Sequence, residues 1–150
     1  NTQKKLDIFL REHKSIKKYL EIKNVSNYHA NLYDLYYKNF FILIREKCKN
    51  DADFCVRSNI SKSNYLQILN GEYVPTKEEL LGACFALKLT VYDARELLAE
   101  FNMTLDKNDI YDKIIINQLI HENYDVYAVN EIMFLKKYKQ LGSFVQPALF

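Results

Sequence analysis

The fold is decided by residues 51–98, which read DADFCVRSNISKSNYLQILNGEYVPTKEELLGACFALKLTVYDARELL. Apolar residues recur there at helical spacing, and a capping residue stands before each apolar segment. Asn50 can cap a first helix that contains Phe54, and this helix ends at Asn59, because asparagine tolerates the left-handed conformation of a tight turn. Ser61 can cap a second helix. The pattern therefore predicts two short helices joined by a tight turn.

The second half of the same stretch carries further helix boundaries. The second helix is expected to stop at Asn70 and Gly71, and a loop closed by Pro75 follows. Thr76 and Glu79 have the spacing of a capping box, in which each side chain accepts a hydrogen bond from the backbone of the other residue. The sequence predicts a third helix from this point.

The rest of the chain also has helical patterning. Thr90 and Asp93 repeat the capping spacing, two more helices are expected from about Asp109 and about Val126, and an aromatic helix is expected after Leu32. Three glycines and two prolines are too few for the many tight turns of a sandwich or barrel. The predicted fold class is all-α.

Residues 51–98 resemble the lambda-repressor and Cro family of helix-turn-helix domains. Gly71 and Pro75 stand at the family's spacing in the NGEYVPT connector, and the KLTV segment resembles the family's link to the next helix. Two departures are Asn59, where the family usually has glycine, and Asp51, where it often has glutamine. The resemblance implies a lambda-repressor-like helix-turn-helix bundle, with an N-terminal basic helix and two extra C-terminal helices.

A closer resemblance covers residues 40–142, including the NYDVYAVNEIMF helix and a terminal LGS. This region looks like the helix-turn-helix tail of some bacterial macro-domain proteins, which implies a bacterial or phage regulatory or recognition module. No macro-domain sequence is present in the chain. The predicted organisation is a basic helical segment over residues 1–31, a helix-turn-helix domain with its C-terminal extension over residues 32–142, and a tail over residues 143–150.

In this family's docking mode the second helix enters the major groove of double-stranded DNA, and its outward residues read base edges. Asparagine and glutamine can pair with adenine, lysine can donate to guanine, and surrounding cations hold the phosphates. The sequence thus predicts a DNA-binding regulator of transcription. The predicted interface consists of Lys62, Ser63, Asn64, Gln67, Arg57, Lys77, Lys14, Lys17 and Lys18.

Charge is unevenly distributed along the chain, and this asymmetry is compatible with DNA binding and with other interpretations. Residues 1–50 carry 11 lysines and arginines against 5 acids, whereas residues 51–150 carry 10 against 14. The basic segment could meet phosphates, could be an ordinary solvated helix face, or could contact the acidic second half of the protein. Asp51 and Asp53, at the start of the first helix, would repel a phosphate there.

The alternative is that the chain is a helix-turn-helix module that does not bind DNA and that regulates a partner protein by recognising it. The chain has 12 tyrosines and 9 phenylalanines, and exposed aromatic residues are frequent in protein interfaces. These rings could instead lie at the rim of the core. A homodimer formed through the last two helices would serve either function. The candidate aromatic residues are Tyr33, Tyr36, Tyr37, Tyr73, Tyr111, Tyr124 and Tyr127.

Catalytic and metal-binding patterns are not found in the sequence. His13, His29 and His121 are scattered, with no second ligand at metal-binding spacing, and there is no phosphate-binding glycine-rich loop or nucleophile elbow. The acids at 106, 109 and 112 are interpreted as helix-capping and first-turn charges. We therefore expect no enzyme activity, no metal and no cofactor.

The cysteines and the apolar runs bear on localisation. Cys48, Cys55 and Cys84 are odd in number and form no CxxC pair, which favours reduced core thiols. The longest apolar run, near Ile44, is far shorter than the roughly 20 residues needed to cross a bilayer. A cytoplasmic protein without a membrane partner is expected.

Overall fold

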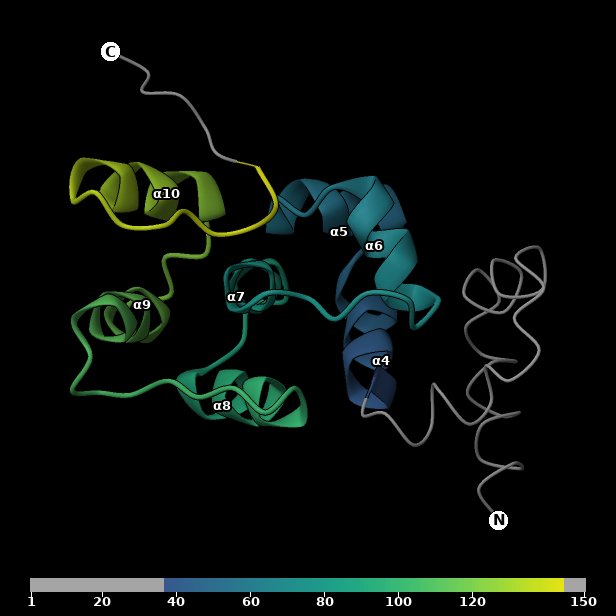
Figure 1. Ribbon diagram of the computed structural model, residues 1–150, viewed down its shortest axis with the longest axis horizontal. Helices are drawn as coiled ribbons and strands as arrows, with labels where there is room; N and C mark the ends of the chain where they lie inside the picture. The colour runs from purple at the N-terminus through teal and green to yellow at the C-terminus, as the bar shows by residue number, and fades with distance from the viewer. Residues whose placement is uncertain (1–36, 145–150) are drawn as a thin grey trace.

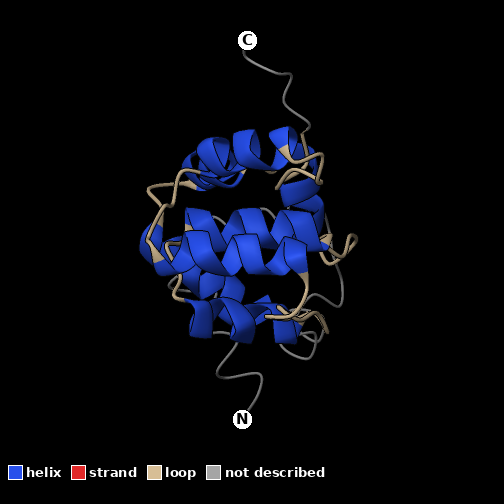
Figure 2. Cartoon of the chain, turned by 90° about the vertical axis from the view of Figure 1, so that its left-hand side faces the viewer, coloured by secondary structure: helices blue, strands red, loops and turns tan. Residues whose placement is uncertain are grey.

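The computed structural model describes residues 37–144, and the predicted basic helix therefore lies outside the described residues. The predicted all-α class is confirmed for the described part, in which Figure 2 shows helices and loops and no strand. Its helices are α4 (Tyr37–Lys47), α5 (Asp51–Ser58), α6 (Lys62–Leu69), α7 (Lys77–Ala86), α8 (Val91–Glu100), α9 (Ile110–Ile120) and α10 (Val126–Leu135).

The helix starts follow from side chains that cap exposed backbone amides. The predicted capping box is present: the Thr76 side chain accepts from the amide of Glu79, and the Glu79 carboxylate accepts from the amide of Thr76. Each capping side chain satisfies at least one of the amides that a helix leaves without an internal partner. The capping residues of α5 to α10 are Asn50, Ser61, Thr76, Thr90, Asp109 and Asp125.

Helix α7 is the centre of the fold, and Figure 1 shows it nearly end-on with the other helices around it. All its residues from Glu79 to Ala86 are buried. It packs most closely on α5, because Gly82 lets the two backbones approach: a Cβ at this position would lie 2.2 Å from the carbonyl oxygen of Ser58. Glycine is thus required at this helix crossing.

An aromatic cluster joins α4 to its neighbours. The ring of Phe40 lies 5.9 Å, centroid to centroid, from those of Phe54 and Phe101, and both pairs are close to edge-on. Phe54 in turn lies 5.2 Å from Tyr65 on α6. All but Phe101 are completely buried, so this cluster contributes a large part of the apolar area removed from water.

After α10 the chain turns back and crosses to the α5–α6 pair, as the yellow end of the ribbon in Figure 1 shows. We call residues 141–144 the C-terminal segment. Leu141 is buried. Its amide donates to the side-chain oxygen of Asn130 on α10, and its carbonyl accepts from the side-chain nitrogen of the same asparagine. The amide of Gly142 then donates to the Glu78 carbonyl at 2.9 Å, and the amide of Ser143 to the Asn59 carbonyl at 2.8 Å. This segment therefore connects α10, α7 and the turn before α6.

Among residues 37–144, no helix combines the length and the apolar character that a bilayer span requires.

Candidate functional site

The turn between α5 and α6 has the conformation predicted from the sequence. Asn59 is left-handed, with φ 59° and ψ 26°, and its amide donates to the carbonyl of Val56. Its side-chain nitrogen donates to the carbonyls of Leu141 at 3.0 Å and Phe144 at 2.9 Å. A glycine could adopt this conformation but could not make these bonds, so the departure from the resembled family pattern has a structural role here.

Helix α6 contains the residues predicted to read DNA, namely Lys62, Ser63, Asn64 and Gln67. Lys62 and Ser63 are exposed, whereas Asn64 and Gln67 are half-buried. The side-chain amide of Asn64 donates to the Glu79 carboxylate at 2.8 Å and contacts the Ser143 hydroxyl at 3.5 Å. The side chain of Gln67 donates to the hydroxyl of Ser63 at 3.3 Å. The amide groups expected to pair with adenine are therefore bonded within the protein.

Glu79 is the acceptor at the centre of this network and is only 1% exposed. Its carboxylate accepts from the hydroxyls of Ser143 at 2.6 Å and Tyr73 at 2.7 Å, besides the bonds from Asn64 and Thr76. Burial alone would raise the pKa of Glu79, but these hydrogen bonds outweigh it and hold the pKa below its ordinary value. The cap was predictable from the sequence, but the bond from Asn64 on α6 was not, because that bond depends on how α6 and α7 pack.

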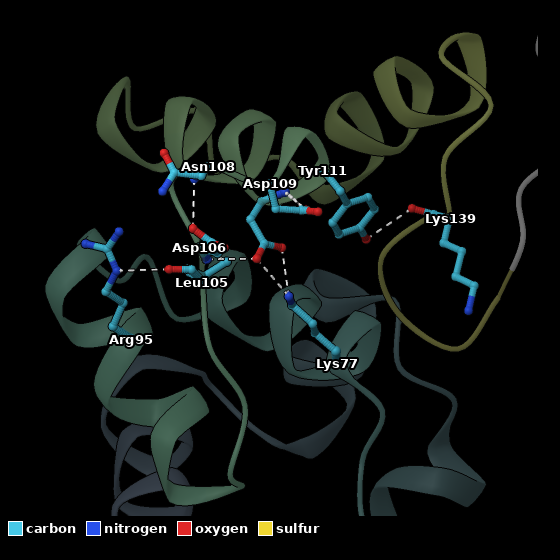
Figure 3. Close-up of polar contacts among 9 residues, drawn as sticks. Lys77, Arg95, Leu105, Asp106, Asn108, Asp109, Tyr111 and Lys139 are labelled. Carbon is cyan, nitrogen blue, oxygen red and sulfur yellow. Dashed lines mark hydrogen bonds and ion pairs between the residues drawn. The ribbon is translucent and has the colours of Figure 1, made fainter.

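Lys77, one of the predicted phosphate contacts, is held in an ion pair on the other side of α7 (Figure 3). Its ammonium lies 2.7 Å and 3.0 Å from the two carboxylate oxygens of Asp112 on α9. The Asp112 side chain is 3% exposed and also accepts from the amide of Asp106 at 2.8 Å. In the same view, the hydroxyl of Tyr111 donates to the carbonyl of Lys139 at 3.2 Å. The charge of Lys77 thus neutralises a buried carboxylate.

Arg57, the other predicted contact on the α5–α6 pair, is also paired. Its Nε lies 3.2 Å from the carboxylate of Asp53 one turn earlier on α5. Asp51 accepts from the hydroxyl of Tyr65 at 2.8 Å and forms an ion pair with Arg45. The remaining predicted cations, Lys14, Lys17 and Lys18, lie outside the described residues. Residues 37–144 carry 14 lysines and arginines against 15 acids, so this part of the chain as a whole has no excess of positive charge.

The candidate aromatic residues lie at several separate places. Among those with described side chains, each tyrosine hydroxyl bonds to the protein: Tyr73 to Glu79, Tyr111 to Lys139, Tyr124 to the Leu89 carbonyl, and Tyr127 to the Val56 carbonyl. Burial, followed by the hydrogen bond to Glu79, raises the pKa of Tyr73 to about 12. Of these four, only Tyr127 is exposed, and the other three are half-buried, an arrangement typical of rings at the rim of a core.

A different exposed surface lies at the C-terminal end of α10. Leu135 is 62% exposed and Phe134 is 39% exposed, and Lys136 and Lys137 follow them directly. The side chain of Lys139 is 82% exposed, and its nearest carboxylate, that of Glu78, is 4.0 Å away. We call this set the α10 surface. A groove of about 480 Å³ in it is lined by Phe134, Leu135, Lys137, Tyr138, Lys139 and Gln140.

Burial favours the protonated form of each described thiol. Burial raises the pKa of Cys84 to about 12 and that of Cys55 to about 11, so both thiols are protonated near neutral pH. Within residues 37–144 no group of three or more histidine, cysteine or acidic side chains is placed to bind a metal ion. His121 is exposed, and its ring contacts the Asn117 carbonyl at 2.8 Å.

Comparison of the chain with family models, with curated proteins and with solved structures found no match. The assignment of the α5–α6 pair to the helix-turn-helix class therefore stays a prediction from the sequence.

Proposed function

We propose that this chain is a non-catalytic helix-turn-helix module that recognises a partner protein through the α10 surface. The observation that carries the proposal is the exposure of Leu135 and Phe134 beside three lysines. Burial of large apolar side chains at the centre of a contact supplies most of the affinity in protein interfaces, and surrounding charges select the partner.

The chemistry of the α10 surface defines the partner. Lys136, Lys137 and Lys139 give it positive charge, and the groove beside Leu135 is almost wholly apolar. A complementary partner presents leucine or phenylalanine side chains flanked by aspartate or glutamate, as on one face of an acidic amphipathic helix. Burial of Leu135 in such a contact would contribute about 1.5 kcal/mol or more.

The contacts of α6 favour this function over reading of base edges. A recognition helix needs polar side chains that are free to form hydrogen bonds with the edges of the bases. The side chain of Asn64 instead donates a hydrogen bond to the buried Glu79 carboxylate. Lys77 forms an ion pair with Asp112, and Arg57 forms one with Asp53. Freeing Asn64 for DNA would leave Glu79 with one hydrogen bond fewer.

Double-stranded DNA is the second candidate, because Lys62 and Ser63 remain exposed in the first turn of α6. In this reading Lys62 would contact a base or a phosphate. The two candidates differ in salt dependence, since DNA binding releases counterions and weakens steeply as salt rises.

The test uses the full chain and two probes, titrated at 50 mM salt. The first probe is a synthetic helix with leucines at positions i, i+3, i+4 and i+7 and glutamates elsewhere on its surface, and the second is a random-sequence DNA duplex. We expect the acidic helix to bind, and Leu135→Ser to weaken its binding about tenfold. Ile120→Ser is the matched control, because Ile120 on α9 is 63% exposed and lies outside the α10 surface.

Two results would contradict the proposal. One is an acidic helix that does not bind, or that is affected equally by the two serine substitutions. The other is duplex binding that falls steeply with salt and is abolished by Lys62→Ala, which would favour the DNA-binding function.

A further inference from the structure

We propose that a groove between α4 and α8 is the docking site for the chain's own basic segment, residues 11–23. This inference does not depend on the proposed function, because the groove involves none of the residues of the α10 surface. The groove has a volume of about 250 Å³ and is lined by Ile42, Leu43, Asp93, Glu96, Leu97 and Glu100.

The groove combines an apolar floor with an acidic rim. Ile42 and Leu43 of α4 are only partly buried against the core, although α4 packs directly on α8. Asp93 and Glu96 are exposed on the α8 side. Arg95, the one basic residue in the α8 sequence, donates to the Leu105 carbonyl at 3.5 Å and does not line the groove (Figure 3). Among the residues whose side chains the structure describes, the lining therefore carries acids and no base.

The sequence of residues 11–23 complements both features. It reads REHKSIKKYLEIK, with apolar Ile16, Tyr19 and Leu20 at helical spacing. Its five basic residues outnumber its two acids. An amphipathic helix of this composition would place its apolar side chains on Ile42 and Leu43 and its lysines beside the acidic rim.

Chain connectivity allows the contact to form within one molecule. Thirteen residues separate position 23 from Tyr37, where α4 begins. An extended linker of that length spans up to about 45 Å, whereas the groove starts at Ile42, within the first two turns of α4. The tethered segment is therefore present at a high effective concentration near the groove.

Docking of this segment has a consequence for Lys14, Lys17 and Lys18, which the sequence offered as phosphate contacts. Their charges would be directed to Asp93 and Glu96, and they would not be available to a nucleic acid. The acidic second half of the protein would then bind the basic first half.

Hydrogen exchange of the full chain, measured by mass spectrometry at low salt, tests the proposal. The variant Asp93→Asn/Glu96→Gln removes two exposed charges without changing side-chain size. We expect exchange over residues 11–23 to become roughly fivefold faster in this variant, because two ion pairs of ordinary exposed strength are lost. Addition of about 1 M salt to the wild type should act in the same direction, since it shortens the screening length.

Glu72→Gln/Glu131→Gln is the matched control, because it removes the same charge from two exposed positions outside the groove. Unchanged exchange in α7 verifies that each variant is folded. The proposal is overturned if the two double variants exchange alike over residues 11–23. It is also overturned if protection of this segment rises with protein concentration, which would identify the groove of a second copy as the docking site.

Discussion

Asn59 has two roles that one substitution can separate. Its backbone is left-handed, and its side chain bonds to two carbonyls of the C-terminal segment. We expect Asn59→Ala to lower the free energy of unfolding by roughly 2–3 kcal/mol, because both bonds are lost and alanine is strained in this conformation. Asn59→Gly should lose only the bonds and cost about 1–2 kcal/mol. Urea denaturation measures both changes.

The control for this prediction is Asn102→Ala. Asn102 is exposed and left-handed, with φ 60°, at the end of α8. Its replacement should cost only the conformational part, about 1 kcal/mol. Equal costs for Asn59→Ala and Asn102→Ala would show that the bonds to the C-terminal segment contribute nothing to stability.

The lowered pKa of Glu79 makes the stability of the fold depend on pH. Its folded pKa is held below the ordinary value, so the folded state binds a proton at this site less readily than the unfolded state does. The stabilisation is therefore complete above the ordinary value of 4.5 and is lost as the pH falls through the lower folded pKa. Urea denaturation from pH 6 down to about 3 should show this loss.

Glu79→Gln should remove this part of the acid dependence. It should also lower stability at neutral pH by roughly 2 kcal/mol, because an amide cannot accept all the hydrogen bonds that the carboxylate accepts. Glu72→Gln, at an exposed position, is the control. An unchanged pH profile in Glu79→Gln would assign the acid sensitivity to other carboxylates.

At the scale of elements, the approach of α5 to α7 depends on Gly82. Alanine normally stabilises a helix relative to glycine, by about 1 kcal/mol. Here the added Cβ would meet the Ser58 carbonyl oxygen at 2.2 Å, so we expect Gly82→Ala to destabilise the fold by roughly 1–3 kcal/mol. Thermal unfolding followed by circular dichroism gives the sign, and a gain in stability would refute the close contact.

An ion pair between Lys77 and Asp112 joins α7 to α9. Lys77→Met keeps the alkyl chain but leaves the buried Asp112 carboxylate without its cation. Breaking a buried pair in this way should cost about 3 kcal/mol, whereas Lys107→Met, at an exposed position, should cost little. Asp112→Asn added to Lys77→Met should recover part of the loss. Additive effects in urea denaturation would show that the two residues are not coupled.

Helix boundaries were predictable because a cap acts over three residues. Asn50, Ser61 and Thr76 each accept from the amide three positions later, and this spacing can be read directly from the sequence. The partners of Asn64 and Lys77 could not be predicted, since they lie 15 and 35 residues further along the chain. Those pairings depend on how the helices are stacked, about which local patterns carry no information.

For the whole molecule, the C-terminal segment is expected to stabilise the fold globally. A chain ended after Gln140 loses buried Leu141 and the bonds to Asn59 and Asn130, and should unfold roughly 3–5 kcal/mol more easily. Gly142→Ala should act in the same direction, because its Cβ would lie 2.4 Å from the Asn59 carbonyl oxygen. Calorimetry measures both, and a melting temperature unchanged in either variant would contradict the prediction.

The sequence indicated the all-α class but not the path of the last described residues. The predicted tail began at residue 143, yet Ser143 bonds to Ser61, Asn64 and Glu79. The segment lacks helical periodicity, so only its contacts reveal its role. Likewise, the α10 surface could be recognised only from the exposure of its residues. Leu135 belongs to an apolar helix, and the sequence of that helix does not distinguish an exposed leucine from a core leucine.

The bond between Asn59 and Leu141 joins residues 82 positions apart. On a ribosome that adds about 5–20 residues per second, Leu141 is made roughly 4–16 s after Asn59. Throughout that interval the nascent α5 and α6 can form, but the asparagine between them lacks its final acceptors. The helix pair is therefore completed only after α10 has been translated and its chain has turned back.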